Sequence, residues 1–414
     1  MPNELERLLV VAFKYPPYAA VGGKRWAKLS KYLARQGVTV DVVTVPWPNG
    51  DPATLADVTH DNIRIHRIPA MSPNRLRITD PRTLLQRVRG KLYRTLVAGR
   101  PVSQDAAWWG PVVIPAVAWI ARRKRSQAIV VTGAPFMANY WIARGKALLP
   151  KVPLVQEFRD PWADLPEASL RSSGTVERVA ALERAVVRSA DAVVTVTGGL
   201  TRLLGSTYPP AHCVTVPNGF DPEEFSPASS ETDHFRLVHG GNLYVGRDEP
   251  LRALLAVVSK HARELPGLEL VFLGGFPDAV RSEFRTLEAH GILRIMPRVS
   301  TADYAREVAT SFATLQFNAE HFPYLVSTKI YEYAAAKKPV LSLNYGGEID
   351  ALIREHALGW SVDARDEREI LDALRESHTL WKTEPGYQSE PVDFEQYDYR
   401  QIVDRYRLVL ESLL

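Results

Sequence analysis

The segment 327–333 combines side chains that could hold a phosphorylated ligand. It runs Ser-Thr-Lys-Ile-Tyr-Glu-Tyr, and Ser327 and Thr328 are favourable N-cap residues that predict the start of a short helix. The first turn of such a helix offers free backbone N–H groups and a positive dipole end, and Lys329 adds a charge there. Glu332 follows about one turn later on nearly the same face. This pattern suits a nucleotide diphosphate whose ribose hydroxyls need an acceptor. The alternative is a capped helix with an exposed lysine and glutamate.

The composition is that of a globular protein with room for two or three domains. The chain has 414 residues, and its net charge of +4 is small for this length, so the charge indicates no particular partner. A single cysteine, Cys213, excludes an intrachain disulfide and a cysteine-based zinc site. The start of the chain lacks a secretory pattern, and the longest apolar stretch, Pro111–Ala121, contains two prolines. We therefore expect a cytoplasmic protein, with contact to the cytoplasmic face of a membrane left open.

Apolar runs and glycine-bearing loops alternate along the chain in a strand–helix pattern. Leu8–Phe13 predicts a strand buried on both faces, a loop with Gly22 and Gly23 follows, and a helix that stops at Gly37 leads into a strand over Val38–Val45. This is a βαβ unit. The same pattern predicts further strands at 63–68, 128–132, 154–158, 192–197, 214–216, 235–239, 268–273, 293–296, 313–317 and 340–343.

These elements predict an α/β protein with two doubly wound domains. The stretch 222–233 is acidic, rich in Pro and Ser and without periodicity, so we place a linker at 222–234 between domains at 1–221 and 235–398. We expect the final helix, 399–414, to pack back on the first domain. In such sheets ligands bind beyond the carboxyl ends of the strands. The loops expected to matter are therefore 14–25, 133–139, 159–164, 240–248, 274–278, 297–300 and 318–329.

Four motifs, spread over most of the chain, resemble the pattern of one known group of proteins. They are Pro16-Pro17 with Gly22-Gly23 and Arg25, then Phe158–Trp162, then Val216–Asp221, and last Ser327–Tyr333 through Pro339-Val340. Each motif alone is moderately specific for this group, and the four motifs in this order and at these spacings are much more specific. The chain resembles glycosyltransferase family 4, whose members have two Rossmann-like domains with an interdomain cleft, the GT-B fold.

The resemblance implies a retaining transfer of a sugar from a nucleotide-activated donor, with no metal and no cofactor beyond that substrate. The habits of the family favour UDP, and they imply a glycan, lipid-linked or small-molecule acceptor. The domain at 1–221 would then hold the acceptor side and 235–398 the nucleotide sugar. The acidic pairs nearest to a metal-binding motif, Asp160 with Asp164 and Asp248 with Glu249, are better interpreted as capping or surface carboxylates.

The sequence departs from the family pattern in two places. The family often has two glutamates separated by seven residues, but if Glu332 is the second, Tyr324 stands at the first position, with Glu320 nearby. The family often has a histidine where this chain has Arg159, and an arginine cannot act as a neutral general base. These departures also suit a non-catalytic sugar-nucleotide-binding partner or activator of another glycosyltransferase. A nucleotide-sugar epimerase of the same architecture is a further alternative.

We predict site residues in both domains. In the first, Gly22 and Gly23 would bring the backbone close to a phosphate or acceptor, against the alternative of a plain turn. Arg159 and Asp160 would lie near the transferred sugar or the acceptor, or would form an ion pair that orients their loop. In the second, the predicted residues would contact the nucleotide-sugar donor. Lys329 and Arg247 would balance diphosphate charge as catalytic groups, Glu332 would accept from the ribose, and Ser327, Thr328, Asn242 and Arg298 would border the donor.

Two histidines and one basic segment each have a structural interpretation as well as a functional one. His239 and His321 are better interpreted as packed histidines than as catalysts. The segment 82–100 carries Arg and Lys with no acid and has leucines at helical spacing, which predicts a basic amphipathic helix. Such a helix either covers the core or lies on an anionic membrane and docks the enzyme to a lipid-linked acceptor. No feature supports binding to nucleic acid.

Overall fold

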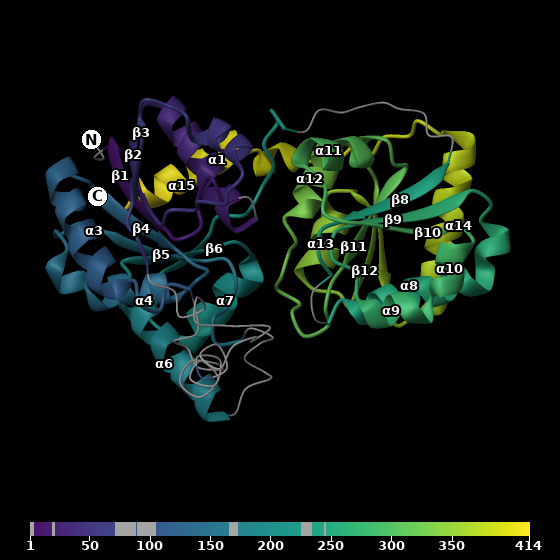
Figure 1. Ribbon diagram of the computed structural model, residues 1–414, viewed down its shortest axis with the longest axis horizontal. Coiled ribbons are helices and arrows are strands. Elements are labelled where there is room, and N and C mark those ends of the chain that lie inside the picture. The colour runs from purple at the N-terminus through teal and green to yellow at the C-terminus, as the bar shows by residue number, and fades with distance from the viewer. Residues whose placement is uncertain are drawn as a thin grey trace. The chain divides into compact units, whose positions relative to one another are not determined.

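The computed structural model describes residues 4–18, 21–70, 88, 105–164, 173–224, 234–243 and 246–414. The chain forms two compact units, one comprising Met1–Pro217 with Tyr399–Leu414 and the other Asn218–Asp398 (Figure 1). The basic segment predicted at 82–100 lies outside the described residues apart from Val88, and so does most of the linker predicted at 222–234.

The first unit is built on a parallel sheet whose described strands run in the order β3-β2-β1-β4-β5-β6-β7. Strand β1 is largely apolar, and β4 and β5 are buried at every residue because helices cover both faces of the sheet. The strand bounds are β1 Arg7–Ala12, β2 Thr39–Thr44, β3 Ile63–Arg67, β4 Ala128–Thr132, β5 Leu154–Phe158, β6 Ala192–Thr195 and β7 Cys213–Thr215.

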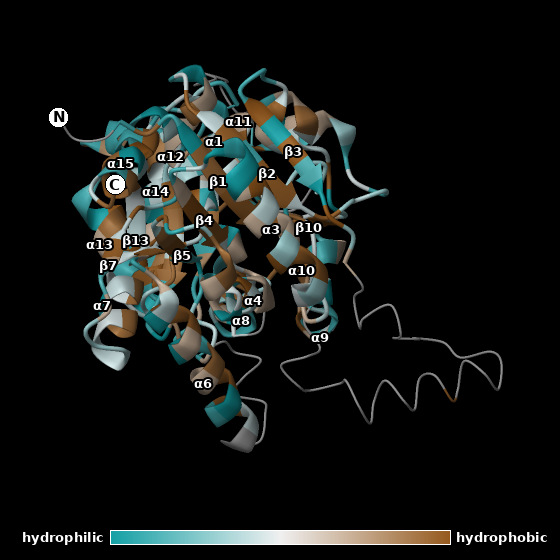
Figure 2. Cartoon of the chain, turned by 90° about the vertical axis from the view of Figure 1, so that its left-hand side faces the viewer, coloured by the Kyte–Doolittle hydropathy of each residue, from teal (hydrophilic) through white to brown (hydrophobic). Residues whose placement is uncertain are grey.

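Two hydrophobic cores lie on the two faces of this sheet. One joins the sheet to α3, α4, α6 and α7, and the other joins it to α1 and α15, which lie side by side in Figure 1. Figure 2 shows the strands between them coloured largely as hydrophobic. The helices are α1 Val21–Arg35, α3 Gly110–Lys124, α4 Met137–Arg144, α6 Ser173–Ser189, α7 Gly198–Thr207 and α15 Tyr399–Glu411, with 3-10 turns η1 Pro52–Val58 and η4 Lys146–Leu148.

The second unit repeats the architecture with strand order β10-β9-β8-β11-β12-β13 among its described residues. Its strands are β8 Phe235–Gly240, β9 Leu268–Leu273, β10 Leu293–Met296, β11 Ala313–Phe317, β12 Val340–Asn344 and β13 Gly359–Asp363. Its helices are α8 Asp248–His261, α9 Asp278–Glu283, α10 Arg285–Ala289, α11 Thr301–Ala309, α12 Lys329–Ala335, α13 Glu348–Glu355 and α14 Glu367–Thr383, with 3-10 turns η5 Ala262–Glu264 and η6 Phe394–Tyr397. The prediction of two doubly wound, Rossmann-like α/β domains is confirmed.

A buried ion pair stabilises the first unit next to Pro217, where the chain passes into the second unit. Arg25 of α1 lies 3.0 Å from the Glu157 carboxylate of β5, and both side chains are almost fully buried. The same guanidinium donates to the carbonyls of Val216, at 2.8 Å, and Pro217, at 2.6 Å. Trp26 Nε1 donates to the other carboxylate oxygen at 2.7 Å. Arg25, which the motif comparison placed in the first loop, is therefore a structural residue that fixes the end of the unit.

The electrostatic balance of this pair favours the charged forms. Burial alone would raise the pKa of Glu157, but Arg25, Thr132 and Trp26 hold it below its usual value. Because the folded pKa is depressed, the stabilisation is present above the unfolded pKa of the carboxyl. It is lost as the pH falls through the folded pKa.

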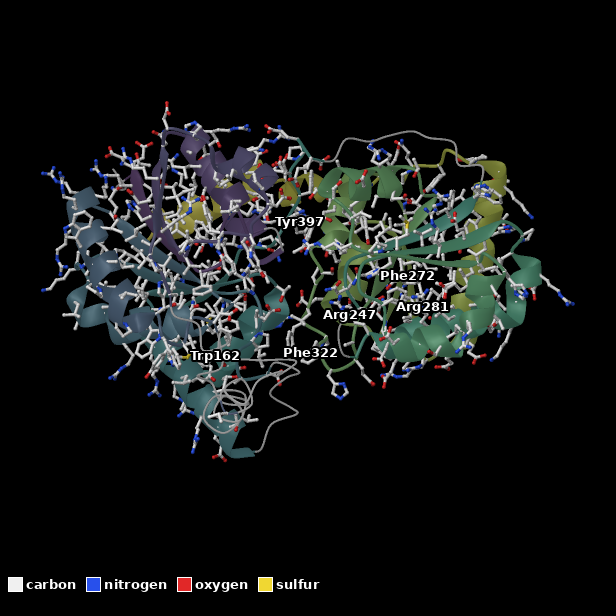
Figure 3. The ribbon with its side chains drawn as sticks, viewed as in Figure 1. Trp162, Arg247, Phe272, Arg281, Phe322 and Tyr397 are labelled. Atoms are coloured by element: carbon white, nitrogen blue, oxygen red, sulfur yellow. The ribbon has the colours of Figure 1, made fainter. Side chains whose placement is uncertain are left out.

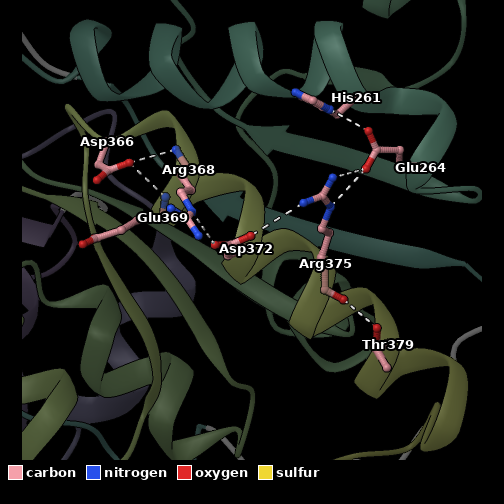
Figure 4. Close-up of polar contacts among 8 residues, drawn as sticks. All are labelled: His261, Glu264, Asp366, Arg368, Glu369, Asp372, Arg375 and Thr379. Atoms are coloured by element: carbon pink, nitrogen blue, oxygen red, sulfur yellow. Dashed lines mark hydrogen bonds and ion pairs between the residues drawn. The ribbon is translucent and has the colours of Figure 1, made fainter.

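We predict that Glu157→Ala strongly destabilises the protein, because it leaves the Arg25 guanidinium buried without its counter-charge. The expected loss in the free energy of unfolding is about 3–5 kcal/mol, measured by urea denaturation at neutral pH. Arg375→Ala is the control. Arg375 of α14 contacts Glu264 and Asp372 on an exposed surface (Figure 4), so its loss should barely move the midpoint. Equal midpoints for Glu157→Ala and the wild type would contradict the structural role of the pair.

Candidate functional site

Arg159 joins the loops after β4 and β5 to the first turn of α1 at the carboxyl edge of the first sheet. Its Nε donates to the Gly133 carbonyl at 2.7 Å, and its Nη1 donates to the Gly22 carbonyl at 3.0 Å. Arg159 follows β5, Gly133 follows β4, and Gly22 opens α1 after β1. Burial lowers the pKa of Arg159, yet an arginine stays charged at neutral pH. The guanidinium therefore orients the backbone at Gly133 and Gly22. Asp160, which is partly buried, follows Arg159 directly in the sequence.

Gly22 and Gly23 lie in the first turn of α1 rather than in the loop before it, which corrects the prediction. A Cβ atom at Gly22 would lie 2.7 Å from Cδ of Lys14, and one at Gly23 would lie 2.9 Å from the Tyr18 carbonyl oxygen. The start of the helix therefore packs closely on its own preceding loop, and the contact with backbone at Gly23 favours glycine there. Their contact with a ligand stays a prediction.

A residue that the sequence reasoning missed, Glu183 of α6, fixes the loop after β5. Its buried carboxylate accepts from the backbone N–H groups of Trp162, at 2.6 Å, and Ala163, at 2.9 Å, and from the Tyr208 hydroxyl at 2.8 Å. Burial is the largest cause of the raised pKa of Glu183. Trp162, labelled in Figure 3, stacks on Phe136 with ring centroids 5.6 Å apart. The loop that carries Asp160 is therefore anchored from both sides.

In the second unit, Lys329 is held between the loop after β8 and helix α11. Its ammonium lies 4.7 Å from the centroid of the Tyr304 ring. A Cβ atom at Gly241 would lie 2.6 Å from Cε of Lys329, so the lysine side chain passes directly over this glycine. Gly241 has a φ of +99°, a conformation that glycine adopts at little cost. Tyr304 could not be predicted as a neighbour of Lys329 from the sequence pattern, because it lies in a different helix.

Glu332, one turn beyond Lys329, lies beside the same tyrosine. Burial is the largest cause of the strongly raised pKa of Tyr304, and the neighbouring Tyr333 and Glu332 add to it. The Tyr333 hydroxyl accepts from the backbone N–H of Gly240 at 3.2 Å. Helix α12 is thereby tied to the carboxyl end of β8. The structure thus brings the predicted pair, Lys329 and Glu332, together around Tyr304.

His239 lies close enough to two cations to respond to their charge. Burial, followed by its neighbours Lys329 and Arg247, lowers the pKa of His239 to about 3. Its Nδ1 lies 2.9 Å from the Leu315 carbonyl oxygen, and the ring packs near Phe317. His239 is therefore a neutral core histidine, as predicted. Arg247 (Figure 3), which directly precedes α8, shares this end of the sheet with Lys329.

The other predicted residues border this cluster or fill structural roles. Asn242 accepts from the backbone N–H of Gly275 at 2.9 Å, which joins the loops after β8 and β9. Arg298 lies exposed in the loop after β10. Thr328 has a helical backbone and makes no side-chain capping bond, which corrects the prediction for that residue. Ser327 Oγ instead accepts from the Lys329 N–H at 3.4 Å.

The residues at the departures from the family pattern have local partners. Glu320 pairs with Arg365, whose guanidinium lies 4.7 Å from the centroid of the Tyr345 ring. Tyr324 packs edge-on to Phe322, which Figure 3 labels. Glu320 is therefore already engaged in an ion pair within its own unit.

The described residues contain no group of three or more His, Cys, Asp or Glu side chains placed to share a metal ion. Asp248, for example, lies in the first turn of α8 and pairs with Arg252 at 2.9 Å. Within the same parts of the chain, every helix is too short or too polar to span a bilayer.

Comparisons with known proteins agree with this arrangement. Residues 22–219 match the family model described as "Glycosyl transferase 4-like domain". No curated protein sequence matches the chain. Among solved structures, HepE of Anabaena in complex with UDP-glucose is similar with a TM-score of 0.65 and 14% identity, covering 98% of this chain and 100% of that one.

Two further structures of similar fold differ in activity. Sucrose-phosphate synthase from Thermosynechococcus elongatus has a TM-score of 0.61 and 15% identity, covering 99% of this chain and 94% of that one. A putative UDP-N-acetylglucosamine 2-epimerase from Listeria monocytogenes has a TM-score of 0.57 and 13% identity, covering 99% and 96%. At these identities the structures establish the fold, and the family match establishes the type of domain. The chain has the GT-B fold, and its residues 22–219 match the glycosyl transferase 4-like domain.

Proposed function

We propose that this chain is a glycosyltransferase and that it takes its sugar from a UDP-sugar bound at the Lys329 cluster of the second unit. The acceptor is a glycan, a lipid-linked glycan or a small molecule, and the transfer proceeds with retention and without a metal ion. The observation that carries the proposal is the geometry around Tyr304, where Lys329 and Glu332 present opposite charges one helical turn apart. Similar folds that hold UDP-sugars, such as HepE with UDP-glucose, support the choice of donor.

The cluster has groups suited to each part of such a donor. Lys329 and Arg247 provide positive charge at the carboxyl end of β8, where the diphosphate becomes the leaving group. Fixed positive charge of this kind stabilises the transition state more than the ground state, because negative charge accumulates as the bond to the sugar breaks. Glu332 supplies an acceptor for the ribose hydroxyls, and a hydrogen bond to a charged group contributes about 1.5–3 kcal/mol.

The first unit would supply the acceptor side. Arg159 already donates to two backbone carbonyls, and it cannot serve as a neutral base, so its role is to position the loop. Asp160 is the group of this loop that would approach the sugar or the acceptor. Glu183 holds the next residues of the loop in place.

The epimerase-like fold gives a second candidate, isomerisation of a nucleotide sugar. The two activities separate in one assay. Incubation of the pure protein with UDP-sugars and no acceptor yields an isomer only if the protein is an epimerase.

A thermal-shift screen with nucleotide sugars tests the donor itself. Stabilisation by UDP-sugars is the expected result, and no response to any nucleotide sugar would contradict the proposal.

We predict that Lys329→Ala and Glu332→Ala each weaken UDP-sugar binding by about ten- to a hundredfold, because each removes one charged contact. Titration calorimetry measures the affinity. The melting temperature without ligand should stay close to that of the wild type. Lys382→Ala, which removes an exposed lysine from α14, is the matched control and should bind normally. Unaltered binding by both site variants would show that the donor lies elsewhere.

We also predict that Gly241→Ala weakens donor binding, because the new methyl group must displace the Lys329 side chain that passes over it. The positive φ of Gly241 adds a stability cost of about 1–3 kcal/mol for any residue with a Cβ atom. Gly205→Ala is the control, since a Cβ atom there meets nothing within 4 Å in helix α7. If Gly241→Ala melts lower but binds UDP-sugar as tightly as the wild type, the lysine is not a donor contact.

A further inference from the structure

Helix α3 presents a row of exposed apolar side chains on its outer face. Val112 is 46% exposed and Trp119 is 63% exposed, and the exposed Pro115 lies between them at helical spacing. Trp108, 39% exposed, lies just before the helix. The opposite face of α3 is buried in the core of the first unit, so the outer row is additional to the packing that the fold needs. Clustered exposed apolar residues of this kind indicate an interaction surface.

A neighbouring turn extends this surface. Leu148 of η4 is 60% exposed. Arg122 at the end of α3 donates to the Leu148 carbonyl at 2.6 Å, so the leucine lies beside the end of the helix. The apolar row therefore continues from α3 onto η4.

Cations follow this row at the end of α3, and acids are missing from the same stretch of sequence. Between Asp105 and Glu157 the sequence contains no Asp or Glu. The same stretch has Lys or Arg at 122, 123, 124, 125, 144, 146 and 151. Lys146 pairs with Asp191. Within the part of the chain that the structure describes, no ion pair joins Arg123, Lys124 or Arg125 to an acid, so their charge is available to an anionic partner.

We propose that this surface, Trp108, Val112, Trp119 and Leu148 with the cations 123–125, docks the protein on an anionic phospholipid bilayer. Tryptophan prefers the interface between lipid and water, and each Lys or Arg near an anionic leaflet adds attraction. A second copy of the chain is a poor occupant, because a symmetric contact would bring the two sets of cations together. This surface is distinct from the segment 82–100 and from the Lys329 cluster.

Co-sedimentation of the full chain with lipid vesicles at low salt tests the proposal. The wild type should bind vesicles of phosphatidylcholine mixed with phosphatidylglycerol, and bind phosphatidylcholine alone only weakly. The double variant Arg123→Glu/Lys124→Glu should lower the affinity for the anionic vesicles at least about tenfold, because it reverses two charges at the membrane surface. Trp119→Ala should lower it several-fold.

Matched controls separate this surface from general effects of charge and hydrophobicity. Arg368→Glu/Lys382→Glu makes the same change of net charge on α14, and Leu408→Ala removes an apolar side chain that is 67% exposed on α15. Both controls should bind vesicles like the wild type, and thermal melting checks that every variant is folded. UDP-sugar affinity without lipid should be unchanged in all four variants, so a failure here is distinct from a failure of the proposed function.

Two results would overturn the proposal. One is a wild-type protein that does not bind the anionic vesicles, or α3 variants that bind them as well as the controls do. The other is loss of retention on immobilised poly-glutamate by the α3 variants with vesicle binding intact, which would assign the surface to an acidic protein partner.

Discussion

The parallel pairing of the described strands brings the carboxyl ends of β1, β4 and β5 to one edge of the first sheet. It does the same for β8, β9 and β11 in the second sheet. Parallel strands need crossover helices, and these bury both faces of each sheet, so polar side chains can gather only where strands end. Arg159, Gly133, Gly241 and Asn242 all occupy such positions. The parallel direction of the strands therefore determines where the candidate site residues lie, whichever side chains occupy those positions.

The two edges hold charge in different ways. At the first, charged side chains turn inward and act on the protein: Arg25 meets Glu157, Arg159 meets backbone carbonyls, and Glu183 meets backbone N–H groups. At the second, the Lys329 ammonium lies over the ring of Tyr304, a contact that fixes its position. This difference agrees with the proposal that charged side chains position loops in the first unit, whereas they bind a charged ligand in the second.

The sequence allowed much of the framework to be predicted. The bounds of β4, β5, β9, β10 and β11 matched because these strands are short apolar runs that end in loop residues. The strand β13 and helix α14 were not predicted, since Gly359–Asp363 is only partly apolar and the helix is strongly polar on its outer face.

The site was predictable only where it is local in sequence. Lys329 and Glu332 lie on one short helix, so their spacing could be interpreted directly, whereas Tyr304 and Gly241 come from distant segments. Gly22 and Gly23 were misplaced because a helix that packs closely on its preceding loop needs the same residues as a turn. Glu157, the one acid in the buried strand β5, was a signal that could have revealed the buried ion pair.

The return of the chain through α15 has a consequence for how the protein is made. Tyr399, Ile402, Val403, Tyr406 and Leu410 all belong to one core of the first unit, although ribosomes add them after every residue of the second unit. The second unit is continuous over Asn218–Asp398 and can close its cores as soon as it emerges. The first unit is incomplete until α15 has been added, so the nascent chain carries an uncovered apolar face while the second unit is synthesised, a stage at which chaperones act.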